Sequence, residues 1–259
     1  MSNDSQDELA GTEAPFVSHL VELRDRLIKA IAAIAAVFAV LCIWPGIGHL
    51  YDLLAAPMTA NLPAGTKLIA TNVFSPFLVP LKVTLMGAFL IALPIVLYQL
   101  WAFVAPGLYS HEKKLVLPLV VTSTLLFFVG VAFCYFIVIP ALTKFIVGVS
   151  SASINVAPDI EQYFGTVLTL FVVFGLAFEV PVAVIVLARV GIVNVKQLRE
   201  WRGYFIVAAF VVAAIVTPPD VISQLSLAIP MIILYEIGII AAQVLIKHTK
   251  APEESPPAR

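Results

Sequence analysis

The sequence predicts an all-α, polytopic membrane protein with six transmembrane helices. Of its 259 residues, 61% are hydrophobic and only 12% are charged, whereas soluble globular chains carry about 25% charged residues. The mean hydropathy of +1.03 agrees with this. The apolar residues gather in runs of about 20, the length that a helix needs to cross a hydrocarbon core of ~30 Å. Lysine and arginine are distributed unevenly between alternate loops, as expected when these loops lie on opposite sides of a membrane.

Six apolar runs give the expected spans. They are Leu27–Trp44, Val83–Val104, Leu115–Ile139, Phe164–Ala188, Tyr204–Val216 and Leu225–Ile246. The fifth run has 13 residues, or about 20 Å of helix. It is therefore undersized, and either the bilayer thins around it or its polar ends extend to reach the interface.

The positive charges set the orientation. One set of segments holds twelve of the 15 lysines and arginines, with three near the start of the first span, two in the second loop, four in the fourth loop and three in the C-terminal segment. The opposite side holds only Lys67, Lys82 and Lys144. Because cytoplasmic loops carry the excess of positive charge, both termini are expected in the cytoplasm, in agreement with an even number of spans.

Three segments are expected outside the spans. Residues 1–15 and 248–259 are polar and rich in charge, so we expect two disordered cytoplasmic tails around a membrane domain of residues 16–247. The acidic start does not resemble a cleavable signal peptide. In the long outer loop at 45–76, "HLYDLLAAPM" is a candidate for a short interfacial helix. The other outer loops are 140–162 and the tight turn "TPPDVISQ".

The segment "PFVSHLVELRDRLIK" before the first span has two faces. Its apolar face carries Phe16, Leu20, Leu23 and Leu27, and its polar face carries His19, Glu22 and Arg26. One interpretation is an amphipathic helix at the cytoplasmic membrane surface, with Glu22 and Arg26 as an i,i+4 ion pair. The other is a binding surface.

The cytoplasmic loop in "QLWAFVAPGLYSHEKK" is a second candidate site. Trp101 and Tyr109 suit a membrane interface, and Glu112 precedes two lysines in what is either a solvated charge run or part of a docking platform. No H-E-x-x-H, G-x-S-x-G or P-loop motif occurs in the sequence. We therefore expect no catalytic residue, metal, cofactor or nucleic-acid partner, and we expect both cysteines, Cys42 and Cys134, to be buried hydrophobes.

Glu179, in "FGLAFEVPVAV", lies ten residues before Arg189, or ~15 Å along a helix. Its carboxyl group is thus near the bilayer midplane, where an ionised, lipid-facing group costs at least ~2.5 kcal/mol. Two alternatives remain: a protonated carboxyl that bonds a neighbouring helix, or a carboxylate in a water-accessible cavity, with Pro181 bending the helix around it. Glu236, eleven residues before Lys247, is also deep enough to need a partner.

Four stretches, in order, resemble the TatC family, the core subunit of the twin-arginine protein translocase. They are "HLVELRDRL", "YQLWAFVAPGLYSHEKK", "FGLAFEVPVAV" and "TPPDVISQLSLAIPM", and the resemblance runs from Phe16 to Lys247. It implies a concave, glove-like bundle of six helices, the last two short, in the cytoplasmic (inner) membrane. It also implies recognition of paired-arginine signal peptides on folded cargo, single-span TatA and TatB partners, self-association in a receptor complex, and transport driven by the proton-motive force.

The resemblance assigns roles to eight residues, and the depth of Glu236 adds a ninth. Glu22, Arg24, Phe103 and Glu112 correspond to signal-peptide-binding positions, Glu179 to the family's intramembrane glutamate, and Asp220 to the acid of the last outer turn. Thr217 and Gln224 correspond to contacts with partner helices, and Glu236 is grouped with Glu179 as an intramembrane polar residue. Asn72 stands where some relatives carry an acid and receives no role.

Two other functions remain open from the sequence. A proton-coupled secondary transporter would use Glu179 as its proton site and would move small molecules without partner subunits. An intramembrane enzyme would need a nucleophile or a metal dyad, and the sequence offers no such pair.

Overall fold

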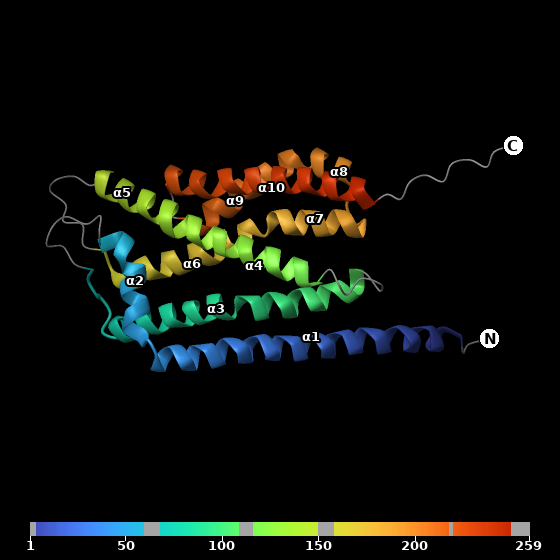
Figure 1. The fold of residues 1–259 in the computed structure, drawn as a ribbon, viewed down its shortest axis with the longest axis horizontal. Coiled ribbons are helices and arrows are strands. Elements are labelled where there is room, and N and C mark those ends of the chain that lie inside the picture. Colours follow the sequence, from blue (N-terminus) through green and yellow to red (C-terminus); the bar gives the residue numbers. More distant parts are fainter. Residues whose placement is uncertain (1–3, 60–67, 109–115, 150–157, 218–219, 250–259) are drawn as a thin grey trace. The chain divides into compact units, whose positions relative to one another are not determined.

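The computed structural model describes residues 4–59, 68–108, 116–149, 158–217 and 220–249, and within these ranges the chain is mostly helical (Figure 1). The helices are α1 (Asp4–Ile43), α2 (Ile47–Thr59), α3 (Ser75–Leu108), α4 (Val116–Phe133), the π-helix η2 (Cys134–Val138), α5 (Ile139–Val149), α6 (Ile160–Phe178), α7 (Val180–Val190), α8 (Val195–Glu200), α9 (Arg202–Val216) and α10 (Val221–Thr249). The helix predicted in the first outer loop is thus present as α2.

Five stretches of helix in the described ranges are long and apolar enough to cross a membrane. They are Ser18–Ile43, Ser75–Val104, Val116–Gly148, Ile160–Arg189 and Val221–Leu245. The shorter apolar helix Arg202–Val216 is the undersized span, whose 15 residues correspond to about 22 Å. The all-helical, polytopic fold is confirmed.

Two expectations about helix length need correction. The last helix is not short, because α10 has 29 residues; its second half contains no proline or glycine after Gly238 that would end it before residue 249. The first helix starts early, because α1 begins at Asp4, inside the predicted tail. Its acidic residues Asp4, Asp7 and Glu8 lie near the N-terminus of the helix, where they complement the helix dipole.

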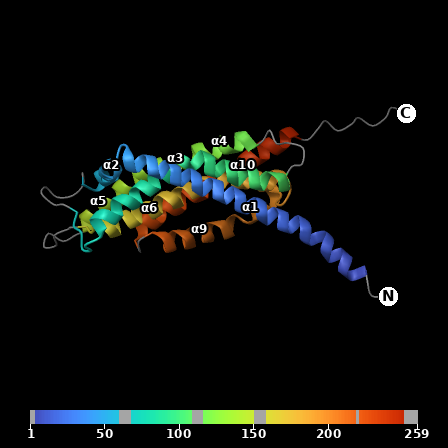
Figure 2. The ribbon, with the colours of Figure 1, turned by 90° about the horizontal axis from the view of Figure 1, so that it is seen from below.

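The chain forms two compact units. The first comprises Met1–Leu54 with Phe74–Thr124, and the second comprises Ala55–Val73 with Leu125–Arg259. In the first unit α1 and α3 run antiparallel and side by side, as both views show (Figures 1 and 2). Gly87 of α3 makes room for Leu50, because a Cβ atom there would lie 3.3 Å from Leu50 Cδ1.

In the second unit two glycines bring α4 and α6 close together. A Cβ atom on Gly130 would lie 2.5 Å from the carbonyl oxygen of Phe174, and one on Gly175 would collide with the ring of Phe127. Phe133 continues the contact, with its ring centroid 5.8 Å from that of Phe174. The π-helix η2 follows directly, and Cys134 is fully buried there.

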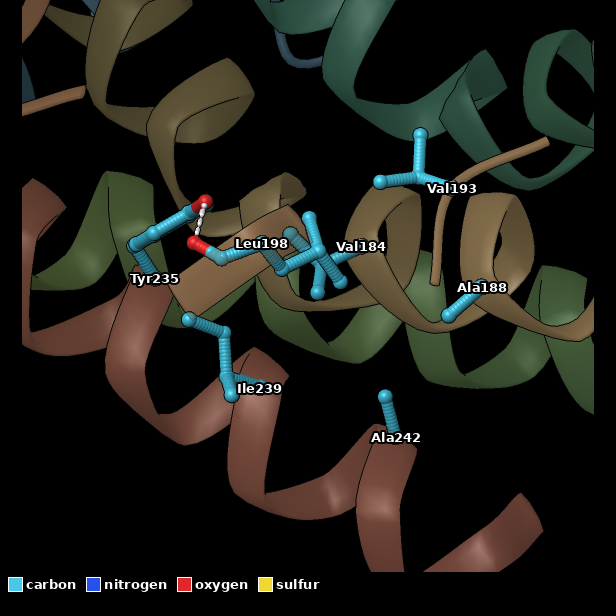
Figure 3. Packing of buried hydrophobic residues seen from close by; sticks show 7 residues of the cluster. All are labelled: Val184, Ala188, Val193, Leu198, Tyr235, Ile239 and Ala242. Atoms are coloured by element: carbon cyan, nitrogen blue, oxygen red, sulfur yellow. Dashed lines mark hydrogen bonds between the residues drawn. The ribbon is translucent and has the colours of Figure 1, made fainter. Parts of the chain in front are cut away.

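The helices α7, α8 and α10 share a small apolar core in the second unit (Figure 3). It consists of Val184, Ala188, Val193, Leu198, Tyr235, Ile239 and Ala242. The hydroxyl of Tyr235 donates to the carbonyl oxygen of Leu198 at 2.8 Å, and the Phe205 ring stacks on the Tyr235 ring at 4.0 Å. The short α9 is therefore supplemented by α8, which packs beside the second half of α10.

A contact between two outer loops, also within the second unit, supports the predicted loop arrangement. The backbone of Ile69 accepts from Ile160 N at 2.8 Å and donates to Pro158 O at 3.0 Å. Two predicted spans separate these segments along the chain, so their pairing agrees with both loops lying on one side of the membrane.

Candidate functional site

The polar face of α1 carries a forked ion pair. The Nε and Nη2 atoms of Arg26 both donate to Oε1 of Glu22, at 2.9 and 2.6 Å. The pair is partly sheltered, with 37% of the Glu22 side chain and 23% of the Arg26 side chain exposed. The i,i+4 pair expected from the sequence is confirmed.

An aromatic stack lies one helical turn before this pair. The imidazole of His19 stacks on the ring of Phe103 from α3, with centroids 4.3 Å apart and an interplanar angle of 18°. His19 and Glu22 are three residues apart and so are neighbours on the surface of α1. The structure thus brings two of the predicted binding residues, Glu22 and Phe103, to the same end of the first unit.

The end of α3 is held from its other side. Trp101, two residues before Phe103, is buried, and its indole Nε1 donates to Ser123 Oγ of α4 at 2.9 Å. Two residues correspond to 200° around a helix, so the two rings point in nearly opposite directions. Trp101 therefore fixes the rotation of α3 that presents Phe103 to α1.

Arg24 does not join this cluster. It lies 200° from Glu22 around the helix, and its guanidinium pairs with the adjacent Asp25 at 2.9 Å. Both side chains of that pair are exposed, 66% for Arg24 and 51% for Asp25. Glu112 lies outside the described residues, so its place beside Glu22 stays a prediction.

Glu179 stands where one span is interrupted. It is both the C-cap residue of α6 and the N-cap residue of α7, and Pro181 lies in the first turn of α7. The predicted effect of Pro181 is confirmed as a break between two helices, because proline suits a helix start but not a helix interior. Both carboxylate oxygens of Glu179 are buried, and a water-accessible cavity around them stays a prediction.

Glu236 pairs with an arginine, and both side chains remain partly exposed, 36% for Glu236 and 45% for Arg202. Nη2 of Arg202 donates to Oε2 of Glu236 at 2.6 Å, joining the start of α9 to the middle of α10. The sequence indicates the need for a partner but does not identify it, because the two residues are 34 positions apart. The signal available in the sequence was that Arg202 lies two residues before the undersized run Tyr204–Val216.

The last outer turn contains three further predicted residues. Asp220 caps α10, because its Oδ1 accepts from Ser223 N at 2.7 Å. Thr217 is buried and its hydroxyl donates to Ala213 O at 2.8 Å. Gln224 remains half-buried and donates to Phe210 O at 3.3 Å. Of the two proposed partner contacts, Gln224 is thus the more accessible.

Sequence reasoning missed one contact of the site, the stacking of His19 on Phe103. Its spacing from Glu22 identified the correct helix face, but stacking across two helices leaves no local pattern. Within the ranges that the structure describes, no cluster of three or more potential metal ligands occurs. The chemistry that this end of the first unit offers is recognition of a cation, with a carboxylate to bind it and an aromatic surface beside it.

Comparison with known proteins identifies relatives along nearly the whole chain. Residues 18–230 match the family model described as Sec-independent protein translocase protein (TatC). A protein of that name from Azotobacter chroococcum is 48% identical over 94% of each chain. Another from Halothiobacillus neapolitanus is 48% identical over 90% of this chain, which spans 63% of that relative's length.

The fold has been solved in a relative. A crystal structure described as the twin-arginine translocase receptor TatC matches with a TM-score of 0.77 and 40% identity, covering 88% of this chain and 99% of the other. The relatives are named as translocase components, a class of membrane transport protein and not of enzyme.

Proposed function

Because this chain belongs to the TatC family of Sec-independent protein translocase components, we propose that it is the receptor that binds paired-arginine signal peptides. The proposed site comprises Glu22 and Phe103 at the cytoplasmic face, together with Glu112. One observation carries the proposal: Glu22 already holds a guanidinium group through a two-point fork, so its surroundings accommodate the chemical group that a peptide arginine presents.

The chemistry favours arginine over lysine at such a site. A guanidinium is planar and offers several N–H donors in a fixed fork, whereas an ammonium is a compact point charge that is more strongly hydrated. A guanidinium also stacks on aromatic faces, which the ring of Phe103 beside His19 would provide. A peptide with two arginines can thus engage a carboxylate and an aromatic surface together.

The rest of the proposal concerns transport. The chain works in the cytoplasmic membrane with both termini in the cytoplasm, in a complex with further copies of itself and with single-span TatA and TatB subunits. Gln224, half-buried near the end of α9, supplies a polar contact for a partner helix. Movement of folded cargo draws on the proton-motive force, with Glu179 as the intramembrane carboxyl group.

The receptor role can be tested by peptide binding. A fluorescent paired-arginine signal peptide is titrated onto membranes that contain the wild-type protein, Glu22→Gln or Phe103→Ala at matched expression. A charge-assisted hydrogen bond contributes about 1.5–3 kcal/mol, so Glu22→Gln should weaken binding about tenfold or more. A peptide with both arginines changed to lysine is the control ligand and should bind weakly. Equal affinity of wild type and both variants would refute this site.

A further inference from the structure

We propose that Arg26 is a resident guanidinium group that occupies Glu22 in the empty receptor and has to be displaced when a signal peptide binds. The inference rests on the proposed function of Glu22 and adds a form of autoinhibition to it. Arg26 would thereby set how strongly a peptide has to bind before it is accepted.

The first step is the geometry of the pair. Two nitrogen atoms of Arg26 converge on one oxygen of Glu22, at 2.9 and 2.6 Å. Charge-assisted N–H···O bonds of this kind are also those by which a carboxylate binds an external arginine, and here both go to Oε1. Arg26 therefore donates to Glu22, from within the same helix, the kind of hydrogen bonds that a peptide arginine would donate.

The second step is the shelter of the pair. The Arg26 side chain is only 23% exposed, compared with 66% for Arg24 in its pair with Asp25. Burial strengthens an ion pair relative to an exposed one because water screens it less. The Glu22–Arg26 contact is thus the more persistent of the two arginine contacts on this part of α1.

The third step is the consequence for peptide affinity. Any cation that binds Oε1 of Glu22 has to break the same internal pair first, whether it is an arginine or a lysine. Arg26 therefore lowers the affinity for every peptide by a common factor and leaves the ratio of arginine to lysine affinity unchanged. Its effect is a threshold of affinity that excludes weakly binding peptides. The preference for arginine over lysine comes from the planar guanidinium group of the peptide.

The test uses Arg26→Met, which keeps an apolar stem of similar length and removes the donors. An i,i+4 pair contributes about 0.3–0.5 kcal/mol when exposed, and surface pairs reach about 1 kcal/mol. Release of Glu22 should therefore raise the affinity for a paired-arginine peptide about two- to fivefold. The affinity for the paired-lysine peptide should rise by the same factor. Binding is measured with the full chain in membranes, as in the test of the receptor role.

The matched control is Lys29→Met. Lys29 is exposed on the same helix, so this variant removes one positive charge without touching the pair. If the peptide affinity rises more in Arg26→Met than in Lys29→Met, the difference measures the release of Glu22. Equal rises would show that only the loss of one positive charge matters, and they would overturn the proposal. Arg26→Gln serves as a second variant if Arg26→Met does not accumulate in the membrane.

Failure of this inference and failure of the receptor site give different results. If Glu22→Gln weakens binding but Arg26→Met also weakens it or leaves it unchanged, Arg26 only positions Glu22 and the resident-guanidinium proposal is wrong. If Glu22→Gln has no effect, the receptor site itself is wrong. In the double variant Glu22→Gln, Arg26→Met the gain should vanish, because there is no carboxylate left to release.

Discussion

Asp159 shows how one carboxylate can join two loops of the second unit. Its Oδ1 accepts from the backbone N–H groups of Glu161 and Gln162 at 2.9 and 3.0 Å, which caps α6. Its Oδ2 accepts from the hydroxyl and the backbone N–H of Thr71, at 2.6 and 3.0 Å. These bonds, led by that of the Thr71 hydroxyl, lower the pKa of Asp159 to about 2.

The lowered pKa predicts how this contact depends on pH. Because the pKa in the folded protein lies below its ordinary value of about 3.9, the contact stabilises the fold fully above that value and is lost as the pH falls through about 2. The difference in melting temperature between wild type and Asp159→Ala should be constant from pH 7 to pH 5. It should shrink below pH 4. A difference that already declines between pH 7 and pH 5 would contradict the shifted pKa.

His19 gives a second prediction for a single residue. If its ring holds Phe103 in place, His19→Ala should weaken peptide binding, and His19→Phe should retain it because an aromatic ring can still stack. A stacked pair contributes about 0.5–1.5 kcal/mol beyond burial, so the expected loss is about two- to tenfold. The measurement is titration of the fluorescent peptide onto membranes that carry each variant at matched expression. Equal loss in both variants would indicate that the imidazole acts through its nitrogen atoms and not through stacking.

These residues mark the limit of prediction from sequence. The Glu22–Arg26 pair could be predicted because both partners lie on one helix at a fixed spacing. The need of Glu236 for a partner could also be predicted, from its depth in an apolar run. The identity of Arg202 could not, and neither could the His19–Phe103 stack, because each depends on which helices become neighbours in the fold.

At the scale of elements, the short α9 is accommodated by its neighbours. The break after α8 lets Arg202 begin α9 at the level of Glu236, in the middle of α10. Beyond that level α8 covers α10 through Leu198, whose carbonyl oxygen is bonded by Tyr235 (Figure 3). The undersized run was evident from its length, but the compensation by α8 was not, since a six-residue polar segment carries little pattern.

The Arg202–Glu236 pair should hold α9 to α10. Arg202→Met or Glu236→Met alone breaks a pair whose side chains are 45% and 36% exposed, so each change should lower the free energy of unfolding by about 0.2–1 kcal/mol. The double variant should recover part of the loss, with a coupling energy of up to about 1 kcal/mol. Thermal unfolding in detergent measures the three variants, and Arg199→Met, which removes an exposed charge from α8, is the control. Additive effects would show that the pair contributes no coupling.

The glycines between α4 and α6 give a prediction for helix packing. Gly130→Ala places a methyl group against the backbone oxygen of Phe174, so the helices have to separate at a cost of about 1–3 kcal/mol. Gly165→Ala, on the same α6 but with open space around it, should be neutral or stabilising by about 0.5–1 kcal/mol. Comparison of the two melting temperatures tests the close approach, and a stable Gly130→Ala variant would contradict it.

At the scale of the whole molecule, the fold class could be predicted because hydropathy and charge bias are summed over many residues. Errors at single positions average out, so five of the six predicted spans correspond to described helices long and apolar enough to cross a membrane, and the undersized fifth span corresponds to the shorter helix Arg202–Val216. The ends of α1 and α10 were predicted less accurately. Outside the apolar runs only helix propensity indicates where a helix begins and ends, and that signal comes from a few residues. Glu112, on which half of the proposed carboxylate site depends, lies outside the described residues.

The orientation in the membrane is the last prediction. The bridge between Ile69 and Asp159 pairs the two long outer loops, and the charge bias assigns α8 to the opposite side. In a variant without native cysteines, Val73→Cys (Val73 is 90% exposed) should react with an impermeant maleimide applied to spheroplasts. Lys196→Cys, exposed on α8, should react only in inverted membrane vesicles. The two positions control each other, because each is the reactive site in one preparation and the protected site in the other. Labelling of Lys196→Cys in intact spheroplasts would reverse the assignment, and it would move Glu22 and Phe103 to the side that a cytoplasmic signal peptide cannot reach.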